Sequence, residues 1–135
     1  MKDLLRQRLI DDEGLRLKVY RCTAGALTIG VGHNLDAKGI SQAIAMQMLD
    51  EDIEDAIAGA KQLVTNYDEL SDPRKVVLCS MVFQMGLDGM KKWKNTLRAI
   101  EEKDFKKAAY NMRLSLWYRQ TPARAERLIK MMEEG

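Results

Sequence analysis

Residues 15–32 read LRLKVYRCTAGALTIGVG, and this stretch decides the class of fold that the sequence predicts. Apolar and polar or charged residues alternate over positions 15–20, which predicts a half-buried strand. The alternation returns over 27–31, and Thr23-Ala24-Gly25 between the two runs is typical of a turn. The stretch therefore predicts a β-hairpin.

Helices are predicted on both sides of the hairpin. Before it, Leu4, Leu5, Leu9 and Ile10 share one face of a short helix that should stop near Gly14. After Gly39 the apolar spacing changes to a period of 3.6 residues. The later helices are expected over 41–63 with Ser41 as N-cap, from Ser71-Asp72-Pro73 to Gly86, over 90–100, 103–113 and 115–119, and from Thr121-Pro122 through Met132.

These elements predict an α+β fold that is mainly helical. A small hairpin lobe of about 14–40, a bridging helix of about 41–63 and a helical lobe of about 64–135 plus the N-terminal helix would form one domain over 1–135. The segment from Val76 to Phe83 is apolar on most sides, so its helix should be the central buried one.

Composition excludes several classes of protein. The 135 residues are 46% apolar and 31% charged, which is typical of a globular chain. The 22 basic and 20 acidic residues leave a net charge of +2, so a strongly basic nucleic-acid binder is excluded.

No apolar run is long enough for a membrane span or a secretory signal, so we expect no membrane insertion and a cytoplasmic start. Two cysteines and one histidine predict free thiols, no metal site and no cofactor.

Single residues give few functional signals. Glu13 stands where the first helix ends and the hairpin begins, and a carboxyl partly desolvated between two lobes suits a general acid. On position alone, the more ordinary interpretation is a solvated glutamate at the helix end, in an acidic trio with Asp11 and Asp12. Taken alone, four further candidates have ordinary structural interpretations: Cys22, Thr28, His33 and Arg124.

Three blocks of the sequence, taken together, resemble a known protein family. They are Asp12–Lys18 with Tyr20, Thr23 and Thr28–His33; Met81–Gly86; and Trp117-Tyr118 with Gln120-Thr121-Pro122 and Arg124-Ala125. In this order, and over essentially the whole chain, the sequence resembles the phage-type lysozymes of the T-even bacteriophage group. The resemblance implies a two-lobed fold and a monomeric muramidase, an endolysin that cleaves peptidoglycan between N-acetylmuramic acid and N-acetylglucosamine.

The resemblance also implies roles for individual residues. Glu13 would be the general acid, Thr28 would help to hold the attacking water, and Arg124 would pair with the acid. Gln84 would face substrate, and His33 would form a structural pair with Asp52. Gly30, which with Gly32 leaves one face of the second strand without side chains, is expected to bind substrate.

The sequence departs from the family pattern in three places. The usual catalytic aspartate falls on Cys22, which is compatible with a base, a nucleophile or a bystander. A function for this thiol needs a lowered pKa or proton transfer during the reaction, and Arg21 and Arg124 are the charges expected to help. The stretch between His33 and Ser41 is short, so another strand and a small helix of the family are expected to be missing. The chain also ends early, after Glu133-Glu134-Gly135.

The predicted reaction is glycosidic hydrolysis with inversion, in which water attacks from the side of Cys22 and Thr28. Direct attack by the Cys22 sulfur would give retention instead. An alternative is a catalytically impaired lysozyme fold that binds peptidoglycan or serves as a phage structural protein, and an engineered cysteine is a further reading. By the resemblance, the enzyme would be made in the host cytoplasm and act in the periplasm after another protein permeabilises the membrane.

Overall fold

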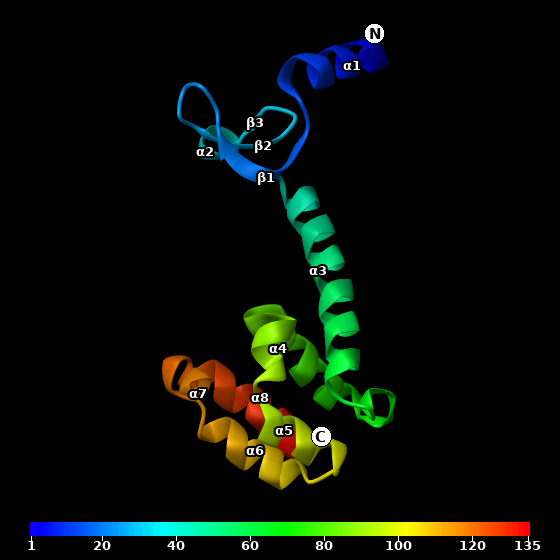
Figure 1. Ribbon diagram of the computed structural model, residues 1–135, viewed down its shortest axis with the longest axis vertical. Helices are drawn as coiled ribbons and strands as arrows, with labels where there is room; N and C mark the ends of the chain where they lie inside the picture. Colours follow the sequence, from blue (N-terminus) through cyan, green and yellow to red (C-terminus); the bar gives the residue numbers. More distant parts are fainter. The chain divides into compact units, whose positions relative to one another are not determined.

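The computed structural model describes every residue from 1 to 135, and its contacts divide the chain into two compact units, Met1–Gln47 and Met48–Gly135. The first unit holds α1 (Lys2–Glu13), β1 (Arg16–Arg21), β2 (Leu27–Gly30), β3 (His33–Asn34) and α2 (Leu35–Lys38) (Figure 1). Helix α3 (Gln42–Leu63) begins in the first unit and ends in the second. The second unit continues with the 3-10 helix η1 (Tyr67–Glu69), α4 (Asp72–Lys91), α5 (Lys94–Glu101), α6 (Phe105–Arg113), α7 (Leu116–Gln120) and α8 (Pro122–Glu134). The predicted class, α+β and mainly helical, is confirmed.

The first unit is built around a three-stranded antiparallel sheet with the order β1-β2-β3. The predicted hairpin is confirmed as β1 and β2. Its two strands are irregularly paired, because Arg16 lies opposite Gly30 and Tyr20 lies opposite Thr28. Three residues of β1 therefore face the single residue Ile29, which is a bulge that bends and twists the strand locally.

The bulge overturns the prediction of a half-buried first strand. Leu15, Leu17 and Val19 are 61%, 82% and 54% exposed. A strand buries one face only while its side chains alternate with a period of two. The extra residues interrupt that period, so these three apolar side chains do not share a buried face.

The short connection after β2 is more regular than the sequence predicts. It contains the two-residue strand β3 and the single-turn helix α2, which were expected to be missing. The Asn34 side chain caps α2 by accepting from Ala37 N at 2.9 Å. Asp36 on α2 accepts from Leu27 N at 2.8 Å and so ties the helix to β2. Two side-chain hydrogen bonds thus order a connection too short for a longer helix.

Helix α4 supplies much of the core of the second unit, but the predicted burial on most sides is wrong at Val76 and Phe83, which are 50% and 52% exposed. Ser71 caps it by accepting from Arg74 N at 3.4 Å, and Pro73 lies in its first turn. Its buried side chains are Val77, Leu78, Met81, Val82 and Met90. Gly86, predicted to end the helix, takes a φ of 77° and breaks it, and a further short helical segment follows to Lys91.

The last helix completes this core. Ala125, Ile129 and Met132 of α8 are fully buried at the spacing expected for one helix face. Thr121 is the N-cap residue of α8 and Pro122 follows it in the first turn, as predicted, but the Thr121 hydroxyl makes no capping bond and donates instead to Trp117 O at 3.1 Å. By contrast, Ser41 accepts from Ile44 N at 3.2 Å, so its predicted capping of α3 is confirmed.

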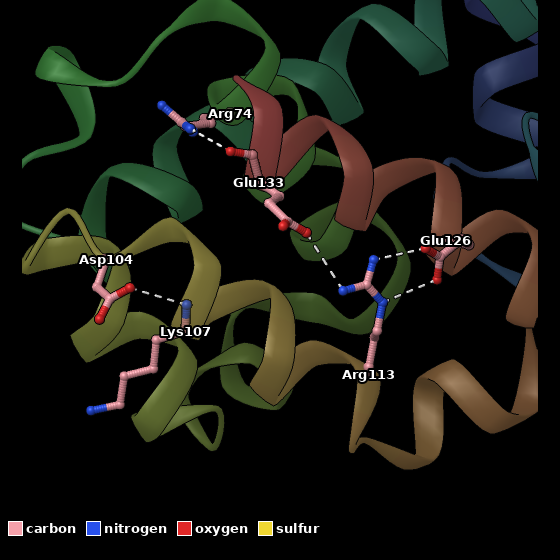
Figure 2. A network of polar contacts seen from close by, with 6 residues as sticks. All are labelled: Arg74, Asp104, Lys107, Arg113, Glu126 and Glu133. Atoms are coloured by element: carbon pink, nitrogen blue, oxygen red, sulfur yellow. Dashed lines mark hydrogen bonds and ion pairs between the residues drawn. The ribbon is translucent and has the colours of Figure 1, made fainter.

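Polar contacts hold α8 in place (Figure 2). Arg113 of α6 donates through two nitrogens to the carboxylate of Glu126, at 2.8 and 3.3 Å, and lies 3.5 Å from Glu133. Arg74 of α4 donates to the backbone oxygens of Met132 and Glu133 at 2.7 and 2.9 Å. The end of α8 is therefore fixed to two other helices.

Candidate active site

Glu13, the candidate acid, is placed by glycines. It is the last residue of α1, and Gly14 follows with a φ of 75° that ends the helix and turns the chain toward β1. Its exposed side chain lies against Gly32, which follows β2: a Cβ there would come within 3.1 Å of Glu13 Oε2. Gly32 also has a φ of 64°. The close approach expected at this glycine is thus made by Glu13 itself.

Cys22 lies at the opposite end of β1, in a tight turn. Its backbone N–H donates to Ala26 O at 3.0 Å, and its own carbonyl accepts from Gly25 N at 2.8 Å. Gly25 takes a φ of 85°, the geometry of a three-residue hairpin loop that ends in a left-handed residue. The predicted turn over Thr23–Gly25 is confirmed.

The turn lowers the pKa of the Cys22 thiol. The backbone N–H of Ala26 contributes most, the N–H groups of Ala24 and Gly25 act in the same direction, and so does the Thr28 hydroxyl. Partial burial of the sulfur opposes them. Backbone donors that point at one atom favour its anionic form. Arg21, which the sequence suggested as a helper, instead donates to Gly25 O at 3.0 Å.

The hydroxyl of Thr28 has two acceptors within reach. It donates to Ala26 O at 2.9 Å, and it also contributes to the lowered pKa of Cys22. A hydroxyl carries one hydrogen, so it donates to only one of them at a time. Thr28 is 3% exposed, which makes it the most buried residue near the turn. The structure therefore brings Cys22 and Thr28 together, and strand β1 separates both from Glu13 in sequence.

Gly30 and His33 lie on β2 and β3. Gly30 has a φ of 69°, and a Cβ built on it would meet nothing within 4 Å, so the space over it is open. His33 Nε2 donates to Gly39 O at 2.6 Å, since a carbonyl only accepts. A pair between His33 and Asp52, which lies in the second unit, would therefore use Nδ1. That pair stays a prediction.

The remaining candidates belong to the second unit. The Oε1 atom of Gln84 accepts from the indole nitrogen of the buried Trp117 at 2.9 Å, a bond between residues 33 positions apart that no sequence pattern predicts. Arg124, in the first turn of α8, is exposed and lines a groove of about 440 Å³ with residues of α3 and α4 such as Ile53 and Cys79. Its pairing with Glu13 stays a prediction.

Two further features of the molecule concern metal ions and membranes. No group of three or more His, Cys, Asp or Glu side chains is arranged to hold a metal ion. None of the helices is both long enough and apolar enough to span a membrane. The sequence missed the backbone donors of Ala24–Ala26, although a glycine three residues after a cysteine in a hairpin signals a tight turn of this kind.

Comparison with known proteins gives a consistent result. A family model described as phage lysozyme matches residues 11–131. A probable T4-type lysozyme 2 of Dictyostelium discoideum is 32% identical over the whole chain and 94% of its own length. The pre-baseplate central spike protein Gp5 of Enterobacteria phage T4 is 31% identical over the whole chain and 28% of its own length. The endolysin of Salmonella phage P22 is 33% identical over 76% of the chain and 73% of its own length.

Proposed function

The chain belongs to the phage lysozyme family and at that level is a peptidoglycan hydrolase, and we propose that it is a muramidase that lyses bacterial cells. The bond cleaved is the one between N-acetylmuramic acid and N-acetylglucosamine. The observation that carries this proposal is the placement of two pairs of residues in the first unit: Glu13, at the end of α1, lies against Gly32, and Cys22 lies with Thr28 at the hairpin turn.

Glu13 carries the carboxyl group that acts as the general acid. It protonates the glycosidic oxygen as the bond to the sugar breaks, and the leaving group departs as an alcohol. Its position against a glycine supports this role, because no side chain fills the space next to the carboxyl. The anomeric carbon then takes on positive charge and needs a nucleophile from the other side of the ring.

The nucleophile is a water molecule that Cys22 and Thr28 hold, and Cys22 accepts its proton. A water molecule that donates one hydrogen to the sulfur and is held by the Thr28 oxygen attacks the anomeric carbon with inversion. The water's proton passes to the thiolate as the water oxygen bonds to the anomeric carbon, so the step ends with a thiol, a neutral product hydroxyl and a Glu13 carboxylate without its proton. Exchange with solvent then returns a proton to Glu13 and removes one from the thiol, which restores both groups. The lowered pKa of Cys22 supports this role, because a thiolate is the form that accepts a proton.

Substrate contacts and location follow from the same proposal. Gly30 leaves open space beside Thr28 for the sugar. Gln84 offers its amide NH2 group, since its oxygen is taken by Trp117. The monomeric enzyme acts on the wall in the periplasm, after a separate protein has permeabilised the membrane. No cofactor takes part.

The test is a lysis assay on Gram-negative cells stripped of their outer membrane, combined with measurement of released reducing ends. The parent protein should clear the cells and release N-acetylmuramic acid ends. Glu13→Gln keeps the shape of the side chain but has no proton to transfer, so the rate should fall about 10²- to 10⁴-fold. A parent protein that binds sacculi without releasing reducing ends would favour the alternative of an impaired, peptidoglycan-binding fold.

A further inference from the structure

Arg16 differs from the other arginines of the first unit. Arg6 pairs with Asp3, Arg8 pairs with Asp12, and Arg21 donates to Gly25 O. Within this unit Arg16 has no carboxylate or carbonyl partner. Its guanidinium lies instead over the ring of Tyr20, with 4.3 Å between Cζ and the ring centroid. The planar group is thus held by a ring while its N–H donors remain free.

The bulge in β1 creates this contact. Four residues along a regular strand span roughly 13 Å, beyond the reach of a flat stack between neighbouring side chains. The partners of Arg16 and Tyr20 are Gly30 and Thr28, which are only two positions apart, or roughly 7 Å. The extra residues of β1 therefore gather Arg16 and Tyr20 side by side.

The pair stands on the sheet face that carries Thr28. Residues directly opposite each other in an antiparallel pair point to the same face, so Arg16 and Tyr20 share the face of Gly30 and Thr28. Gly30 contributes no side chain, and the space over it is open. The Arg16 guanidinium, with its free N–H donors, therefore borders the open space over Gly30. This space is next to Thr28, the residue proposed to hold the attacking water.

We propose that Arg16 is a specificity-determining residue, which binds a carboxylate of the stem peptides carried by the glycan strand. This inference rests on the proposed function. The stem peptides make peptidoglycan an anionic polymer, and a guanidinium fork binds a carboxylate through two parallel hydrogen bonds. Stacking on Tyr20 fixes the plane of the fork before substrate arrives, so less rotamer freedom is lost on binding.

The experiment measures binding rather than turnover, in the Glu13→Gln background. The probes are soluble, stem-bearing glycan fragments and the same fragments after carbodiimide amidation of their carboxylates. The Glu13→Gln protein should bind the native fragments roughly tenfold to hundredfold more tightly than the amidated ones, the range expected for charge-assisted hydrogen bonds. Adding Arg16→Gln should remove this preference by weakening the binding of native fragments alone.

Three further variants sharpen the comparison. Lys18→Gln removes the same charge from the same strand and should keep the preference. Arg16→Lys keeps the charge without the fork, and Tyr20→Leu removes the ring under it, so both should lose part of the preference. Equal weakening of both probes by Arg16→Gln, or an equal loss in Lys18→Gln, would overturn the inference. So would binding that never distinguishes the two probes.

Hydrolysis of the native fragments by the parent protein is measured beside the binding. If the parent fails to hydrolyse them but shows the Arg16-dependent preference, the proposed function is wrong and the carboxylate site stands. If the parent hydrolyses both probes with equal KM and binding shows no preference, the function stands and the inference is wrong. The two failures are therefore distinguishable.

Discussion

Cys22 should behave as an unusually acidic thiol, because the N–H groups of the hairpin turn and the Thr28 hydroxyl all favour its anionic form. In a Cys79→Ser background, the absorbance change that accompanies thiolate formation should have its midpoint below that of a free cysteine, about 8.5. Thr28→Val removes one donor and should raise the midpoint, whereas Thr28→Ser should keep it. A midpoint that does not differ between Val and Ser would exclude a role for the hydroxyl.

The activity of Cys22 variants tests its function separately. Cys22→Ala should lose most of the lytic activity, because Thr28 alone is left to hold the attacking water. Cys22→Asp should retain activity and make the rate less dependent on pH above neutrality, since a carboxylate is already ionised there. Cys79→Ser serves as the control and should lyse cells as the parent does. Parent-level lysis by Cys22→Ala would show that Cys22 is a bystander.

Gly32 should be needed for the position of Glu13. In Gly32→Ala the new methyl group meets the Glu13 side chain at 3.1–3.3 Å, so the carboxyl has to move. Misplacement of a reacting group by about 1 Å costs on the order of 10²-fold in rate. Gly39→Ala is the matched control, because Gly39 also has positive φ but has nothing within 4 Å of a Cβ. Both variants should lose similar thermal stability, and only Gly32→Ala should lose activity beyond that.

At the scale of elements, the pair between α6 and α8 makes stability depend on pH. The side chain of Arg113 is the main cause of the lowered pKa of Glu126. A lowered folded-state pKa stabilises the protein above the unfolded value of about 4.3, and that contribution is lost as the pH falls through the folded value. The melting temperature of the parent should therefore fall more between pH 5 and pH 3 than that of Glu126→Gln. Parallel curves would contradict the prediction.

Arg74 should be a second point of attachment for α8. It caps the helix through the backbone oxygens of Met132 and Glu133 and stacks on Phe105, with 3.5 Å between Cζ and the ring centroid. Arg74→Met keeps much of the apolar stem and removes the donors, so unfolding should become easier by about 2 kcal/mol in urea titrations. Arg98→Met, an exposed position on α5, should change the free energy of unfolding by less than about 0.5 kcal/mol. Similar losses in both variants would refute the capping role.

At the scale of the whole molecule, the resemblance predicts that Arg124 of the second unit pairs with Glu13 of the first. A double-mutant cycle tests this, with Arg124→Ala, Glu13→Gln and the double variant compared by melting temperature. The two effects should be clearly non-additive. Arg127→Ala, on the same helix, should add to Glu13→Gln without coupling. Additive behaviour at Arg124 would remove it from the proposed site.

Local signals in the sequence predicted the elements well, and the errors concern which partner a polar group bonds and how two strands are paired. The caps at Ser41 and Ser71 and the turn at Gly25 depend on neighbours in the chain, so sequence sufficed. The position of the N-cap at Thr121 was predicted, but its capping bond is absent because the hydroxyl donates to the Trp117 carbonyl. The sequence did not predict the bulge in β1, because the alternation of apolar and polar residues continues through it. The donors around Cys22 are backbone groups, which residue identity does not reveal.

The burial of α8 also bears on how the protein is made. All three proposed catalytic residues lie in the first unit, which precedes the helical core in the sequence. The core around α4 closes only when Ala125, Ile129 and Met132 arrive and Arg74 reaches oxygens 58 and 59 residues further on. Helix α4 therefore keeps its apolar face uncovered until residues 125–132 have left the ribosome. A stalled or truncated nascent chain would expose that face to chaperones and proteases.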